Sequence, residues 1–210
     1  MLVVASSISL SASFPPLDLG ILAWFALSPL LFVLRQRVLL SAANLGFLFG
    51  FLHCIGSFSW ATQIATINFY NFLLSLIVFS LYYFFFGFLY SLTRRNIGSW
   101  IIVGGPALWV GLEYVRSNLF FLSLPWNLLG HSQHRYLLVI QIADITGVYG
   151  LSFIIVMVNQ FLSQMIELFV MRRVVSSKKS TRYTHGINWA AHSLTVALVL
   201  ILTLTYGWYK

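Results

Sequence analysis

The chain has 210 residues, of which 60% are hydrophobic, 17% are aromatic and only 8% are charged. Soluble domains carry about 25% charged residues, and a soluble core of this length could not bury so much apolar surface. The composition therefore excludes a soluble globular protein and predicts that lipid surrounds much of the chain. The formal net charge is +8, but no basic stripe interleaved with polar readout residues accompanies it, which argues against nucleic acid as a partner.

Seven apolar stretches follow one another along the sequence. A bilayer core about 30 Å thick requires about 20 apolar residues in a helix. The first stretch, Leu2 to about Phe14, is shorter and lacks the positive flank of a signal peptide, so we expect it to belong to a helix that is longer in the complete protein. We predict the other spans at residues 21–34, 38–60, 72–92, 99–115, 147–171 and 189–209. The sequence thus predicts an all-α, polytopic transmembrane bundle of about seven spans, forming a single membrane domain over residues 1–210.

The basic residues are concentrated in three of the predicted loops. The loops after the second, fourth and sixth spans carry nine of the twelve Lys and Arg residues, namely Arg35, Arg37, Arg94, Arg95, Arg172, Arg173, Lys178, Lys179 and Arg182. Alternating spans place these three loops on one side of the membrane, and the positive-inside rule makes that side cytoplasmic. We therefore expect the loops at Ser13–Gly20, Thr62–Asn71 and Asn118–Tyr136, together with the C-terminus, to face outward.

The third span carries a pattern that is typical of helix packing. Gly46, Gly50 and Cys54 follow one another at four-residue spacing, which places three small side chains on one helix face. His53 lies beside this face, and we interpret it as a hydrogen-bonded packing residue. Because Cys54 is the single cysteine of the chain, an intrachain disulfide and a cysteine-rich metal site are both excluded.

The sixth span carries a polar stripe. A helical rotation of about 100° per residue brings Gln141, Ser152 and Asn159 within about 20° of one another. Such a stripe faces protein or a wet cavity rather than lipid. Interhelical hydrogen bonding explains Ser152 and Asn159 better than ligand binding does, so we predict that both pack helices together.

The segment Leu124–Phe153 collects polar and aromatic residues in an otherwise apolar chain. Just before it, Glu113 and Arg116 are three residues apart, so they share a helix face and can pair. Two interpretations of this pair stay open. The two charges neutralise each other at the membrane edge, or the arginine meets an anionic phosphate while the glutamate orients it. His131 and His134 are also three apart, but no carboxylate or cysteine partner accompanies them, and we predict no metal site.

Four segments of the chain resemble a known family. They are SFPPLDLG (Ser13–Gly20), GPALWVGLEYVRS (Gly105–Ser117), LPWNLLGHSQ (Leu124–Gln133) and QIADITGVYGLSFIIVMVN (Gln141–Asn159). They are similar to the membrane domain of apolipoprotein N-acyltransferase, they occur in the family's order, and the similarity runs from about Ser13 to the end of the chain. The chain departs from the family pattern at His131, where tyrosine is usual, and at Ser117, where glycine is usual.

The resemblance implies a bacterial inner-membrane enzyme that completes lipoprotein maturation. Such enzymes move an acyl chain from a phospholipid to the amino group of a lipoprotein's diacylglyceryl-modified N-terminal cysteine. They act through a thioester on a periplasmic, nitrilase-like domain, which carries the catalytic Glu, Lys and Cys and follows the seventh span. In this sequence Cys54 lies inside the third span, and the lysines Lys178, Lys179 and Lys210 lie near the ends of spans, so these groups cannot converge. We therefore assign no catalytic residue and no cofactor.

We predict that the chain is the membrane module of such an enzyme, multi-pass in the inner membrane, truncated or split, and not catalytic alone. Its expected partners are membrane phospholipid, a lipidated protein substrate and a separately encoded nitrilase-like domain. The predicted substrate-binding residues are Glu113, Arg116, Trp126, Asn127, His131 and Gln133. Two alternatives stay open. One is a non-catalytic lipid-binding or scaffold membrane protein, and the less favoured one is a small-solute transporter.

Overall fold

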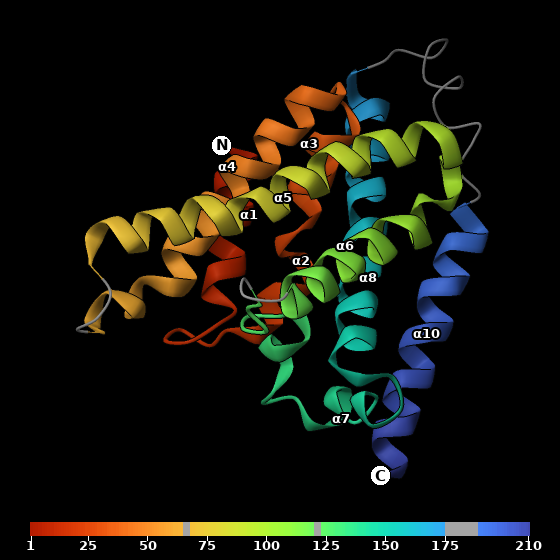
Figure 1. Cartoon of the computed structure of the whole chain (residues 1–210). Coiled ribbons are helices and arrows are strands. Elements are labelled where there is room, and N and C mark those ends of the chain that lie inside the picture. Colours follow the sequence, from red (N-terminus) through yellow and green to blue (C-terminus); the bar gives the residue numbers. More distant parts are fainter. Residues whose placement is uncertain (65–67, 120–122, 175–188) are drawn as a thin grey trace.

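The computed structural model describes residues 1–64, 68–119, 123–174 and 189–210, and these residues form helices and short 3₁₀ turns without any strand (Figure 1). The α-helices are α1 (Leu2–Ala12), α2 (Ala23–Ala26), α3 (Ser28–Arg35), α4 (Leu39–Phe58), α5 (Phe69–Ile97), α6 (Ile101–Asn118), α7 (Leu137–Ile140), α8 (Ala143–Val174) and α10 (Trp189–Tyr209). The 3₁₀ turns are η1 (Gly20–Leu22), η2 (Ser59–Gln63), η3 (Gly98–Trp100) and η5 (Leu129–Gln133). The all-α prediction is confirmed.

Four stretches of the described chain are long and apolar enough to cross a membrane, namely Leu39–Gln63, Phe69–Asn118, Ala143–Val170 and Trp189–Tyr209. The second of these contains 50 residues and comprises two helices, α5 and α6. The chain reverses direction between them at η3, where Gly98 adopts a φ of 53° that favours glycine. Figure 1 shows α5 and α6 running in opposite directions. The basic residues predicted for the loop at Lys178, Lys179 and Arg182 lie outside the described residues.

The second predicted span does not form one continuous helix. The chain over Gly20–Arg35 is divided into η1, α2 and α3, with a break at Leu27. Pro29 follows directly in the first turn of α3, where it lacks a backbone N–H to extend the preceding helix. The break leaves backbone groups that need partners, and Asn159 of α8 supplies them. Its Oδ1 accepts from the backbone N–H groups of Leu27 and Ser28, at 2.8 and 2.9 Å.

The sixth predicted span lies within α8 and begins at a kink. α8 begins at Ala143, earlier than expected, and Gly147 within it has non-helical angles, with φ 66° and ψ −178°. Because of this kink, the residues before and after Gly147 do not follow one regular helical rotation. Ser152 and Asn159 share one uninterrupted helix beyond the kink, whereas Gln141 lies before it and does not belong to their stripe.

The close approach of α4 to α5 depends on glycine. A Cβ at Gly46 would lie 2.1 Å from the carbonyl oxygen of Tyr83, and one at Gly50 would lie 2.3 Å from the Tyr83 ring. Cys54, one turn further along α4, is fully buried. The absence of a side chain at two successive turns lets Tyr83 reach the centre of the bundle.

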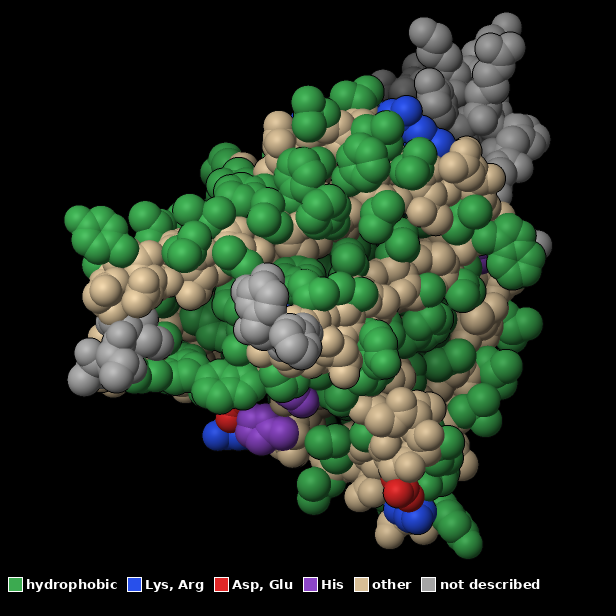
Figure 2. Space-filling model, viewed as in Figure 1, with side chains coloured by type: hydrophobic (Ala, Val, Ile, Leu, Met, Phe, Trp, Pro, Cys, Tyr) green, Lys and Arg blue, Asp and Glu red, His purple; other side chains and the backbone are tan. Residues whose placement is uncertain are grey.

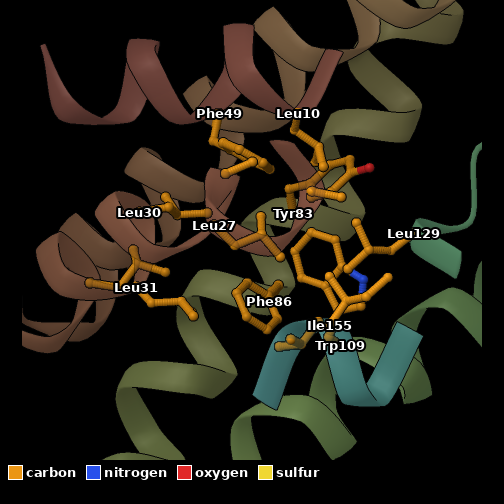
Figure 3. Close-up of a cluster of buried hydrophobic side chains, with 14 of the residues drawn as sticks. Leu10, Leu27, Leu30, Leu31, Phe49, Tyr83, Phe86, Trp109, Leu129 and Ile155 are labelled. Atoms are coloured by element: carbon orange, nitrogen blue, oxygen red, sulfur yellow. The ribbon is translucent and has the colours of Figure 1, made fainter. Parts of the chain in front are cut away.

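The hydrophobic core lies where these helices meet. Figure 3 shows Leu10 of α1, Leu30 of α3, Phe49 of α4, and Tyr83 and Phe86 of α5 directed toward one another. The labelled cluster is completed by Leu27, Leu31 of α3, Trp109 of α6, Leu129 of η5 and Ile155 of α8. Apolar side chains also cover much of the face seen in Figure 2, while the charged groups visible on it lie near its margins. This distribution is the one that lipid requires of a membrane-embedded surface.

The bundle has two polar ends. The C-terminus, η5 and α7 lie at one end (Figure 1), which we call the Lys210 end, and there Lys210 Nζ pairs with Asp144 at 2.9 Å. α8 runs from this end toward the opposite one (Figure 1), which we call the Arg35 end. There Arg35 Nη2 lies 2.8 Å from Glu167 Oε2.

Candidate functional site

Arg116 holds the segment Pro125–Asn127, which we call the Pro-Trp turn, against α6. Its side chain is buried, with only 3% of the residue exposed. Its Nη2 donates to the carbonyl oxygens of Trp126 and Asn127 at 3.1 and 3.2 Å, and its Nη1 donates to the Tyr83 hydroxyl at 3.2 Å. The Arg116 carbonyl oxygen in turn accepts from the backbone N–H of Leu124 at 2.9 Å. A planar guanidinium suits this task because it presents several donors in fixed directions.

Glu113 lies one turn earlier on the same helix and is 5% exposed. Its Oε1 accepts from the indole N–H of Trp109 at 3.0 Å and from the backbone N–H of Leu129 at 2.7 Å. No ion pair joins Glu113 to Arg116 in the described structure, although both line a cavity of about 20 Å³, roughly the room for one water molecule. Instead of pairing with each other, the two side chains hold the backbone of the polar segment that follows.

An apolar hollow opens beside Trp126, and we call it the Trp126 hollow. It measures about 330 Å³ and is lined by Phe58, Trp60, Ala61, Ile64, Phe72, Ser75, Leu76, Phe79, Leu124 and Trp126. The Trp126 residue is 51% exposed, and its ring centroid lies 5.0 Å from that of Trp60 in η2. Because the lining is almost wholly apolar and the volume falls in the range of small-molecule sites, the hollow suits a hydrocarbon chain.

A second hollow, the His131 hollow, lies at the Lys210 end. It measures about 390 Å³ and is lined by Phe14, Pro15, Asn127, Gly130, His131, His134, Ile140, Ala143, Val148 and Leu151. Asn127 has a φ of 52°, and its buried Nδ2 has no hydrogen-bond partner in the described part of the chain. Partial burial, and then the positive charge of Arg116, lower the pKa of His131 below its ordinary value. The His131 imidazole, with its lowered pKa, and the Asn127 side chain therefore both line this hollow.

Gln133 is a structural residue in this arrangement. It is fully buried, its Nε2 donates to the Gly20 carbonyl oxygen at 2.7 Å, and its Oε1 accepts from the Trp24 indole at 2.9 Å. Nearby, the Asp18 carboxylate pairs with Arg135. These contacts tie the Ser13–Gly20 loop to η5, so the loop and the polar segment form one surface at the Lys210 end.

The six predicted site residues lie between Glu113 and Gln133 in the sequence, but they differ in role. Trp126, Asn127 and His131 line the two hollows. The other three, Glu113, Arg116 and Gln133, are buried. Their side chains hydrogen-bond to the backbone of Leu129, Trp126 and Gly20, respectively. Sequence reasoning missed Tyr83 and Trp60, which complete the site from α5 and η2. The only signal for Tyr83 is a hydroxyl in mid-span, which needs a buried partner.

The predicted packing residues make contacts between helices. Ser152 Oγ accepts from the backbone N–H of Gly130 at 2.9 Å, and Asn159 Nδ2 donates to the Ala23 carbonyl oxygen at 2.8 Å. His53 is buried, and its Nδ1 lies 3.1 Å from Ser11 Oγ and 3.2 Å from Ser57 Oγ. Within the described ranges, no group of three or more His, Cys, Asp or Glu residues is placed to hold a metal ion.

Comparisons with known proteins agree on one family. The family model described as "Apolipoprotein N-acyltransferase N-terminal domain" matches residues 6–161. The chain is 35% identical to the apolipoprotein N-acyltransferase of Geobacter metallireducens over 216 aligned residues, which cover 99% of this chain and 39% of that protein. It is 35% identical to the apolipoprotein N-acyltransferase of Rhodopirellula baltica over 100 residues, or 48% of this chain and 16% of that protein. For the protein of the same name from Rickettsia bellii the identity is 29% over 157 residues, or 69% of this chain and 31% of the relative.

The chain thus spans about two fifths of the length of the Geobacter relative, at 39%, and less of the other two. The resemblance that the four sequence segments indicated is confirmed. The family match covers the pieces that build the site, from the Ser13–Gly20 loop through α6 and η5 to Asn159. This chain belongs to the apolipoprotein N-acyltransferase family, through that family's N-terminal domain.

Proposed function

We propose that this chain is the membrane module of an enzyme that transfers an acyl chain from a phospholipid to the N-terminal amino group of a lipidated protein. The observation that carries the proposal is the Trp126 hollow, an apolar space of about 330 Å³ beside a turn that a buried arginine holds in place. The relatives that match this chain are apolipoprotein N-acyltransferases. An enzyme of that kind must receive acyl chains from the bilayer, and the hollow has the chemistry to admit them.

The roles of the predicted residues follow from their burial. Trp126, Asn127 and His131 contact substrate, because they line the two hollows. Glu113, Arg116 and Gln133 act as positioning residues from buried positions: Glu113 holds the backbone of η5, Arg116 holds that of Trp126 and Asn127, and Gln133 ties η5 to the Gly20 carbonyl oxygen. The thioester chemistry belongs to a nitrilase-like domain, encoded with this chain or separately. Cys54 cannot supply it, since its side chain is fully buried in α4.

We further propose that the chain crosses a bacterial inner membrane seven times, with the Lys210 end on the periplasmic side. Arg35 and Arg37 lie at the end of α3, and Arg94 and Arg95 lie at the end of α5. At the Lys210 end, by contrast, the two aspartates Asp18 and Asp144 pair with nearby basic groups. The four arginines support the orientation, because Lys and Arg residues favour the cytoplasmic side even where one of them, Arg35, pairs with a carboxylate.

The first experiment tests lipid binding by the full chain. The protein is placed in nanodiscs that contain a phospholipid with a diazirine on its acyl chain, irradiated, and mapped by peptide mass spectrometry. We expect crosslinks on Phe72 and Phe79, which line the hollow, in excess of those on Leu198, which is 53% exposed on α10. A Ser75→Trp variant fills the hollow and should remove the excess, whereas Ser193→Trp on the exposed side of α10 should not. Equal labelling of Phe72, Phe79 and Leu198 would contradict the proposal.

The second experiment tests the role of Arg116 in acyl transfer. The chain is joined after Lys210 to a nitrilase-like domain, and transfer from phospholipid to a diacylated peptide is measured. Arg116→Ala releases the carbonyl oxygens of Trp126 and Asn127, and a displacement of about 1 Å at a substrate site can lower the rate about 10²-fold. Unchanged acyl transfer together with unchanged phospholipid crosslinking would reject the assignment.

A further inference from the structure

A second polar cluster lies on α8, away from the site described above. Gln160, Ser163, Gln164 and Glu167 are spaced at i, i+3, i+4 and i+7, so they share one helix face. The first three are fully buried. They follow Asn159 toward the Arg35 end of the bundle, and the residues of the two hollows do not include them.

Three other helices bring polar side chains to this face. The Tyr90 hydroxyl of α5 donates to Gln160 Oε1 at 2.9 Å, and His192 Nδ1 of α10 lies 2.9 Å from Gln164 Oε1. Arg35 Nη2 of α3 lies 2.8 Å from Glu167 Oε2. The cluster is therefore the place where α3, α5, α8 and α10 meet through polar contacts rather than through hydrocarbon.

Most of the donors in this cluster have no acceptor. The side-chain nitrogens Gln160 Nε2 and Gln164 Nε2, the Arg35 nitrogens Nε and Nη1, and the hydroxyl Ser163 Oγ are buried and find no hydrogen-bond partner in the described parts of the chain. The amide oxygens of both glutamines are already used by Tyr90 and His192. The carboxylate oxygen Glu167 Oε2 is also buried without a hydrogen bond from the described residues, although it lies 2.8 Å from Arg35 Nη2. What the cluster requires is therefore a small group that accepts from several N–H and O–H groups and can also donate to a carboxylate oxygen.

The charges of the cluster distinguish a neutral acceptor from an anion. Arg35 already pairs with Glu167, so the buried arginine is neutralised without any added ion. A further negative charge placed here would be repelled by Glu167 and would have to leave water, and the buried cation of the cluster, Arg35, is already paired. Water accepts two hydrogen bonds, carries no net charge, and satisfies buried polar groups in this way in many proteins.

We infer that this cluster is an internal hydration site, in which bound water molecules bridge Arg35, Gln160, Ser163 and Gln164 at the junction of α3, α5, α8 and α10. The hydrated junction lies in the half of the bundle near the Arg35 end. It adds water bridges between α3 and α8 beside the direct contact of His192 in α10 with Gln164. This role is independent of the acyl-chain site, because none of the four residues lines the Trp126 hollow.

X-ray radiolytic labelling of the full chain in nanodiscs tests the inference, because the oxidising radicals form from the water molecules themselves. Tyr90 and His192 are buried and contact Gln160 and Gln164 of the cluster, whereas the buried ring of Phe49 packs against Tyr83 and His53. We expect Tyr90 and His192 to be oxidised several-fold faster than Phe49. Oxidation of Tyr90 and His192 at the rate of Phe49 would overturn the inference.

Variants of the donors provide the control. Gln164→Met keeps the length of the side chain but removes its N–H groups, and it should lower oxidation of His192 toward the Phe49 rate. Ser163→Ala is a milder change and should lower oxidation of Tyr90 and His192 in part, even if the glutamine variant fails to fold. Ser80→Ala is the matched control, since Ser80 is fully buried but donates to the Leu76 carbonyl oxygen of its own helix. If an anion fills the site instead, labelling will be low and thermal stability will depend on chloride when it is exchanged for gluconate. That result would also overturn the inference.

Discussion

Asn159 Oδ1 lies 2.8 Å from the backbone nitrogen of Leu27, at the break between α2 and α3. The same oxygen accepts from the backbone N–H of Ser28, and the amide nitrogen donates to the Ala23 carbonyl oxygen. One side chain of α8 thus satisfies three backbone groups of a helix that is interrupted within the bundle. Irregular backbone at membrane depth is tolerated only where such partners exist.

Replacement of Asn159 by Leu should therefore destabilise the bundle. The change leaves three buried backbone groups unpaired, and each unpaired group costs about 1–3 kcal/mol in a protein interior, less where the unfolded chain stays in the membrane. We expect a loss on the order of 2 kcal/mol or more, measured as a lower midpoint of thermal unfolding in detergent. Asn118→Leu is the control, because the Asn118 side chain is exposed and bonds only to Tyr114 of its own helix. Equal midpoints for the two variants would contradict this role of Asn159.

The helical class and the order of the helices could be predicted from the sequence, because hydrophobic length depends only on local composition. The break at Leu27 could not be predicted, because it depends on Asn159, far along the chain. The kink at Gly147 could not be predicted either, because it depends on the backbone angles of one residue. Asn159 illustrates the limit. Its place on a helix face predicted an interhelical hydrogen bond, but not that the partner would be the buried backbone at a helix break.

The packing of α4 against α5 leads to a second prediction. At Gly46 an added Cβ would lie 2.1 Å from the Tyr83 carbonyl oxygen, and backbone atoms cannot move aside as a flexible side chain can. Gly46→Ala should therefore force the helices apart and lower stability by about 1–3 kcal/mol, the usual cost of overpacking. At Gly111 an added Cβ would meet nothing within 4 Å, so Gly111→Ala should be neutral or slightly stabilising in the same melting experiment. A similar loss for both variants would show that the approach to Tyr83 is not the cause.

His131 leads to a prediction about pH. Burial and the charge of Arg116 lower the folded-state pKa of His131 below its ordinary value of 6.5. Between the two pKa values the unfolded chain binds more protons than the folded chain, so stability rises with pH in that window. The contribution is fully present above pH 6.5 and is lost as the pH falls through the folded pKa. The midpoint of thermal unfolding should thus fall more steeply from about pH 7 to pH 5 in the wild type than in His131→Asn. Parallel pH profiles would contradict the assignment.

The candidate site could be predicted in part. The Pro-Trp segment and the pair Glu113 and Arg116 were recognisable because polar residues are unusual in so apolar a chain. Which of them face substrate could not be deduced, since burial depends on how η5 folds back against α6. A phosphate-binding arginine and an arginine that holds carbonyl oxygens have the same sequence pattern. Only the contact of Arg116 with Trp126 distinguishes them.

Trp126 leads to the last prediction, which concerns acyl transfer by the chain joined to a nitrilase-like domain. Its indole is half exposed, stacks near Trp60 and borders the apolar hollow, so it can cover an acyl chain that enters there. Trp126→Ala removes this contact without disturbing the backbone carbonyl oxygen that Arg116 holds. Aromatic side chains at binding sites commonly contribute about 2 kcal/mol or more, so we expect kcat/KM for the phospholipid to fall about 30-fold. Trp208→Ala is the matched control, because Trp208 is 82% exposed on α10 and borders neither hollow. If Trp208→Ala lowers kcat/KM as much as Trp126→Ala, the effect comes from general lipid contact and the Trp126 hollow is not the acyl-chain site.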